Sequence, residues 1–81
     1  NDYNDRNTVV AHLSLDHNER AMELLATMPK DAVTEYLRAI ACSRLGRKEE
    51  GLRHFLEACR LDGRMEYRGN LDPEIAELLK Q

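Results

Sequence analysis

The sequence has few of the features on which sheet-rich and membrane-spanning proteins depend. Among its 81 residues there are no Trp, one Phe, two Pro and four Gly, which argues against a sheet protein with many turns. No apolar run approaches the roughly 20 residues of a membrane-spanning helix, so direct membrane insertion is not expected. No signal-peptide pattern is present, and because the chain does not begin with Met we expect an excised segment or a processed product.

Neither sign of charge dominates the sequence, because the net charge is only −3. Basic residues gather in the middle of the chain, where Arg47, Lys48, Arg53 and Arg60 would lie on the helix after Gly46, as in a helix-turn-helix. Acidic residues interleave with them, and the isoelectric point is near 5.6. This pattern is typical of a solvated helix face, so nucleic-acid binding is not predicted.

Apolar residues at the helical spacing of three and four positions are abundant, and they predict an all-α fold of antiparallel helical hairpins. Turn-forming residues 16–18 separate the first two helices, and Pro29 ends the second. A third helix is expected over about 32–45, with Asp31 as its N-cap, and a fourth over about 47–61. The residues expected to face the core are Val9, Val10, Leu13, Ala21, Leu24, Leu25, Met28, Val33, Tyr36, Leu37, Ile40, Ala41, Leu45, Leu52, Phe55, Leu56 and Cys59.

The last part of the chain is predicted to hold a short capping helix. Residues 64–71 are expected to be irregular, with a turn at Gly69 and Asn70. Asp72 then supplies an N-cap, and Pro73 suits the first helical position. The residues of this helix that are expected to face inward are Ile75, Leu78 and Leu79.

The chain also overlays on itself when it is shifted by 30 residues, so that Asp16 falls on Gly46. Antiparallel helices need small side chains where they approach closely and large ones where the groove between them opens. The matched positions meet this need, and they include Val10 with Ile40, Ala11 with Ala41, Leu15 with Leu45, Ala21 with Gly51, and Leu25 with Phe55.

In the second half of the chain, small and aromatic residues follow one another in a fixed order: Ala39, Gly46, Gly51, Phe55 and Ala58. This order resembles the tetratricopeptide repeat, a helix–turn–helix unit of about 34 residues. The resemblance covers about residues 32–63 well and residues 2–29 more weakly. It implies a fold of about two such repeats plus a C-terminal capping helix.

The resemblance also implies a non-catalytic protein–protein interaction module. In that family the first helix of each repeat lines a concave groove for a protein or peptide. Two of the groove sites hold Tyr36 and Ile40 instead of the Lys and Asn of carboxylate-clamp members, so a clamp for acidic C-termini is not supported. The positions that the resemblance places in the groove are Arg6, Val10, Leu13, Tyr36, Ile40, Ser43 and Arg44.

Two alternatives stay open. The apolar groove residues could pack only against neighbouring helices, because apolar stripes usually belong to a core. The chain could also be a homodimerisation or structural module of a larger protein. We expect one domain over 1–81, with repeats at about 2–30 and 31–63 and a linker and capping helix at 64–81. Since three or more repeats are normally needed for stability, we expect either a C-terminal segment of a longer solenoid or self-association.

No metal or cofactor site is predicted from the histidines and cysteines, because no pair has CxxC or HxxxH spacing. Cys42 and Cys59 are expected to fill small volumes in the core. A disulfide between them is not expected, since the hairpin would separate them by roughly 13 Å along the helix axes. Unpaired thiols favour the cytoplasm, although a periplasmic or outer-membrane-associated parent protein stays open.

No catalytic residue is predicted either. Ser14 and Ser43 have no oriented histidine partner, and the nearest pairing, of His12 with Ser14, points to different helix faces. Carboxylate neighbours such as Glu49 and Glu50 lie on a solvated helix, without the apolar pocket that would raise a pKa. The sequence therefore predicts a binding module and not an enzyme.

Overall fold

The computed structural model describes residues 6–80, which form six helices and contain no strand. The predicted all-α class is therefore confirmed. Residues 2–5 of the predicted first repeat, and the last residue of the predicted cap, lie outside the described range. The helices are α1 (Arg6–Ser14), α2 (Asn18–Leu25), α3 (Ala32–Arg44), α4 (Lys48–Leu61), α5 (Arg64–Asn70) and α6 (Pro73–Leu79).

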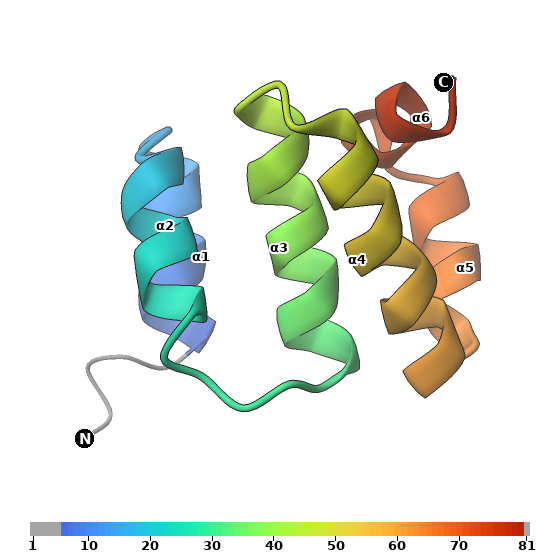
Figure 1. Ribbon diagram of the computed structural model, residues 1–81, viewed down its shortest axis with the longest axis horizontal. Helices are drawn as coiled ribbons and strands as arrows, with labels where there is room; N and C mark the ends of the chain where they lie inside the picture. Colours follow the sequence, from blue (N-terminus) through green and yellow to red (C-terminus); the bar gives the residue numbers. More distant parts are fainter. Residues whose placement is uncertain (1–5, 81) are drawn as a thin grey trace.

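Helix α3 lies at the centre of the arrangement. Figure 1 shows the α1–α2 pair on one side of α3, and α4, α5 and α6 on the other. Helix α6 is seen nearly end-on in this view, so it runs crosswise to α3 and α4 and contacts both of them. Because α3 also contacts α1 and α2, most of its surface is covered by other helices.

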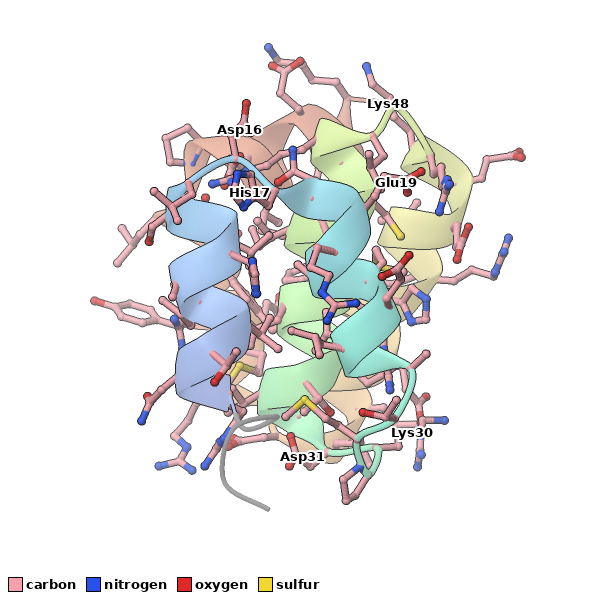
Figure 2. All side chains as sticks on the ribbon, turned by 90° about the vertical axis from the view of Figure 1, so that its left-hand side faces the viewer. Asp16, His17, Glu19, Lys30, Asp31 and Lys48 are labelled. Atoms are coloured by element: carbon pink, nitrogen blue, oxygen red, sulfur yellow. The ribbon has the colours of Figure 1, made fainter. Side chains whose placement is uncertain are left out.

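The turns of the α1–α2 and α3–α4 hairpins have the same backbone geometry. Asp16 and Gly46 both adopt positive φ, at 63° and 79°. The residues that follow them, His17 and Arg47, adopt φ/ψ of −88°/68° and −91°/67°. In each turn the left-handed residue donates its backbone N–H to the carbonyl three positions back, and the next residue donates to the carbonyl five back. The internal similarity found at a shift of 30 residues is thus present in both turns (Figure 2 shows the Asp16–His17 turn).

Replacing Asp16 by Gly is expected to raise the free energy of unfolding by about 1 kcal/mol. Glycine adopts positive φ without the steric cost that a Cβ brings. The side-chain contacts that are lost are weak, because Asp16 is exposed; within residues 6–80 it accepts a hydrogen bond from Asn18 and lies 3.9 Å from the Arg44 guanidinium. Urea denaturation followed by circular dichroism would measure the change. The matched control is Gly46→Asp, which should destabilise by a similar amount. A destabilising Asp16→Gly would contradict the argument.

Local capping places the other helix boundaries. The Asp31 side chain accepts a hydrogen bond from the Thr34 backbone N–H at 2.8 Å, and the Thr34 hydroxyl accepts one from the Asp31 backbone N–H at 2.9 Å. The Asp72 side chain caps α6 through the Glu74 N–H at 3.0 Å. Both predicted N-caps are confirmed. Gly46 follows the end of α3 at Arg44, as predicted.

The prediction that residues 64–71 are irregular is wrong, because Arg64–Asn70 forms α5. Asp62 receives the Arg64 backbone N–H at 3.0 Å and thereby satisfies one free donor at the start of the helix. Gly69 is buried, and a Cβ built on it would lie 2.5 Å from two ring carbons of Phe55. The position requires a glycine because an aromatic ring packs directly on α5, and not because the chain turns there.

The core runs between the hairpins and beneath α6, and it contains most of the residues predicted to be inward. Val10, Leu56 and Leu79 are corrections, since they are 47%, 56% and 48% exposed. Each lies beside a buried neighbour that already fills the inward position, and one residue along a helix turns the side chain by about 100°. The buried hydrophobic residues are Val9, Leu13, Ala21, Leu24, Leu25, Tyr36, Leu37, Ala39, Ile40, Ala41, Cys42, Phe55, Ala58, Met65, Ile75 and Leu78.

Candidate functional site

Three of the seven predicted groove residues are buried in the core. Leu13 and Ile40 are each 6% exposed and Tyr36 is 2% exposed. A partner could not contact these side chains without displacing part of the fold. This corrects the expectation that they line an open groove, and it favours the alternative in which apolar residues of this face pack against neighbouring helices.

Tyr36 is covered by the segment that leads into α6. Its hydroxyl donates to Asp72 Oδ2 at 2.8 Å, while the other oxygen of the same carboxylate caps α6. The Arg68 guanidinium lies 4.8 Å from the centre of the Tyr36 ring, and the Phe55 ring packs against the Tyr36 ring at an interplanar angle of 68°. Burial, together with the Asp72 carboxylate, raises the pKa of Tyr36 above its ordinary value, so the hydroxyl keeps its proton and its role as a donor.

Ser43 and Arg44 also bond to the chain itself. The Ser43 hydroxyl donates to the Glu74 backbone carbonyl at 3.2 Å. Arg44 Nε donates to Glu74 Oε1 at 2.6 Å, and Arg44 Nη1 donates to the Leu13 carbonyl at 2.5 Å. The paired Glu74 carboxylate raises the pKa of Arg44 above its ordinary value. Arg44 therefore joins the end of α1 to the start of α6 through α3.

Arg6 and Val10 are predicted groove residues that are exposed on α1, whereas the exposed Arg44 on α3 is already bonded to Glu74 and the Leu13 carbonyl. They lie one helical turn apart on α1, and Ser14 continues the same row toward solvent. Helix α1 carries apolar residues on two faces: Val9 and Leu13 are buried in the core, whereas Val10 is exposed to solvent. Figure 2 looks onto the α1–α2 pair, with the Asp16–His17 turn at one end and Lys30 and Asp31 at the other. The α1 part of the predicted site thus stays open to a partner.

A buried ionic cluster between α2, α3 and α4 was not predicted from the sequence. Glu35 is only 3% exposed, and it pairs with Arg38 one turn along α3 and with His54 Nδ1 on α4 at 2.9 Å. Arg38 Nη2 also donates to the Leu25 carbonyl at the end of α2, at 2.6 Å. Desolvation of Glu35 acts to raise its pKa, but the bonds from His54 and Arg38 outweigh it and hold the pKa below the ordinary value.

Where α3 packs on α4, three side chains of the types that can ligate a metal lie close together. Ligand atoms of Cys42, Glu50 and His54 all lie within 4.8 Å of one another. Both cysteines of the chain carry free thiols. The spacing rules used on the sequence miss this group because one ligand comes from α3 and two from α4. The useful signal is Glu50 followed by His54 at i+4, with a cysteine across the hairpin turn.

Comparisons with protein-family models, curated proteins and solved structures each gave no match. In residues 6–80, no helix has the length and apolar character needed to cross a membrane. The fold and the side-chain geometry therefore carry the functional argument.

Proposed function

We propose that the protein is a non-catalytic interaction module that binds another protein through the outer face of α1. The observation that supports this proposal is the repetition of one hairpin geometry at a fixed shift, with Asp16 and Gly46 in equivalent positions. Stacked helical hairpins present extended surfaces to protein partners. The resemblance of residues 32–63 to the tetratricopeptide repeat supports the same class of function by analogy.

The outer face of α1 is a part of the predicted groove that a partner can reach. Arg6 offers a guanidinium for a carboxylate, and Val10 offers an apolar contact one turn away. The opposite side of the helix is anchored in the core by Val9 and Leu13. A rigid helix with an apolar and basic outer row suits a partner helix or extended peptide that carries an apolar residue beside an acidic one.

The experiment is selection of binders from a displayed peptide library on the full chain, repeated on two variants. Val10→Asp should abolish enrichment of bound peptides, because it places a carboxylate at the centre of the proposed surface. Leu56→Asp is the matched control, since Leu56 is comparably exposed but lies on α4, and enrichment should persist there. Equal enrichment on both variants, or none on the wild type, would contradict the proposal.

Self-association is the alternative function, and sedimentation equilibrium across a wide concentration range distinguishes it. A monomer at every concentration would leave the α1 face free for another protein. A concentration-dependent dimer that Val10→Asp disrupts and Leu56→Asp preserves would show that a second copy of the chain occupies the face.

A further inference from the structure

The α3–α4 hairpin brings a thiol, a carboxylate and an imidazole to one point. Cys42 lies on α3 near the turn, and Glu50 and His54 lie one turn apart on α4. Their ligand atoms lie within 4.8 Å of one another, and His54 Nε2 is 3.8 Å from Glu50 Oε2. Zinc bonds of about 2.0–2.3 Å place ligand atoms roughly 3.3–3.8 Å apart, so small side-chain rotations would close the set around one ion.

Gly51 makes this convergence possible. A Cβ built on Gly51 would lie 3.1 Å from Cys42 Cβ and 3.3 Å from the Ala39 carbonyl oxygen. The absence of a side chain at Gly51 lets α4 approach α3 closely beside Cys42. Glu50 also lines an open depression of about 420 Å³ at the hairpin turn.

His54 is already oriented as a metal ligand. Its Nδ1 lies 2.9 Å from Glu35 Oε1, and this buried carboxylate is held in turn by Arg38. A carboxylate that accepts the Nδ1 proton fixes the tautomer and leaves Nε2 unprotonated, as in many zinc sites. Nε2 is the nitrogen that faces Glu50, so the free ring nitrogen points into the cluster.

We propose that Cys42, Glu50 and His54 bind one Zn²⁺ ion, with a solvent water in the fourth position and Glu35 as the carboxylate that positions His54. A thiolate, an imidazole and a carboxylate form the mixed set that zinc accepts and that Mg²⁺ and Ca²⁺ do not favour. The thiolate and the carboxylate balance the two positive charges of the ion. The site is independent of the α1 face and of the proposed interaction function.

Binding requires the loss of one proton. Burial and the neighbouring Glu50 raise the pKa of the Cys42 thiol to about 11, whereas Arg47 and Arg53 oppose the shift. As the bond between Cys42 Sγ and the metal forms, the thiol proton is released to solvent, and no oxidant or reductant takes part.

The test is titration of the full reduced chain with Co²⁺ and then with Zn²⁺, followed by absorption spectroscopy. One Co²⁺ per chain should produce a thiolate-to-metal charge-transfer band and tetrahedral d–d bands, and Zn²⁺ should displace it. Cys42→Ser should remove the charge-transfer band, while Cys59→Ser, the other cysteine, should retain it. Glu35→Gln should weaken zinc binding by about 10–100-fold, because His54 loses its orienting carboxylate.

Cys42 is fully buried, so its Ser variant can fail to fold. Glu50→Gln is therefore a second variant that tests zinc binding independently. Glu50 is only partly buried, so this variant should keep the helical circular dichroism spectrum while it loses at least about tenfold in zinc affinity. The proposal is overturned by a wild type without the charge-transfer band, by a band that depends on Cys59, or by unchanged zinc affinity in a folded Glu50→Gln.

Discussion

Replacing Tyr36 by Ala is expected to lower the free energy of unfolding by about 3–5 kcal/mol, the range for removing a large aromatic side chain from a core. Among the residues that the structure describes, Tyr36 is the largest fully buried side chain, and its ring contacts Phe55 and Arg68. Its removal would also leave Asp72, the N-cap of α6, without the phenolic donor. Urea denaturation, with the midpoint and slope both fitted, would measure the loss.

Tyr67→Ala is the matched control, because Tyr67 is 72% exposed and its removal should change stability by no more than about 0.5 kcal/mol. Tyr36→Phe keeps the ring and removes only the hydroxyl, so it should cost about 1–2 kcal/mol. A Tyr36→Ala variant as stable as Tyr67→Ala would mean that Tyr36 is not a core residue, and it would restore the interpretation of this position as part of an open groove.

Helix boundaries that depend on neighbouring residues could be predicted from the sequence. Asp31 and Asp72 accept hydrogen bonds from backbone donors within three positions, and Gly46 donates its N–H to the Ser43 carbonyl three positions back. These interactions involve only a few adjacent residues, so residue type and order were sufficient. The same reasoning found the shift of 30 residues, because the two hairpin turns repeat a local geometry.

Features that depend on residues distant in the sequence could not be predicted in this way. Gly69 has the composition of a turn, but its position is set by the ring of Phe55 on another helix. Likewise, nothing in the order of residues shows that α6 returns to α3 and covers Tyr36. Helical periodicity shows which residues share a face but not which later segment covers that face. The burial of Leu13, Tyr36 and Ile40 could therefore not be predicted from the sequence.

The ionic cluster at Glu35 shows the same limit. Its pairing with Arg38 at i+3 is visible in the sequence, but such pairs usually lie on exposed helix surfaces. Burial is decided by α2 and α4, which bring the Leu25 carbonyl and His54 to the same point. A search for i+3 or i+4 charge pairs on helices that are apolar on two sides would have marked Glu35 as a candidate buried acid.

Replacing Glu35 by Gln is expected to lower the free energy of unfolding by about 3 kcal/mol near neutral pH. The substitution keeps the size of the side chain but leaves the partly buried Arg38 guanidinium without its carboxylate and weakens the hydrogen bond to His54 Nδ1. Glu23→Gln is the matched control, because Glu23 also pairs with an arginine three residues away but is exposed. It should lose no more than about 0.5 kcal/mol.

The pH dependence of stability shows whether the loss of unfolding free energy in Glu35→Gln comes from the missing carboxylate. The folded-state pKa of Glu35 lies below its ordinary value of 4.5, so ionised Glu35 stabilises the fold above that pH. This contribution is lost as the pH falls through the folded-state pKa, and the Gln variant has no such titration. Wild type and Glu35→Gln should therefore converge in stability in acid and stay well separated near neutrality. A separation that persists unchanged in acid would show that the loss comes from packing of the amide and not from the missing charge.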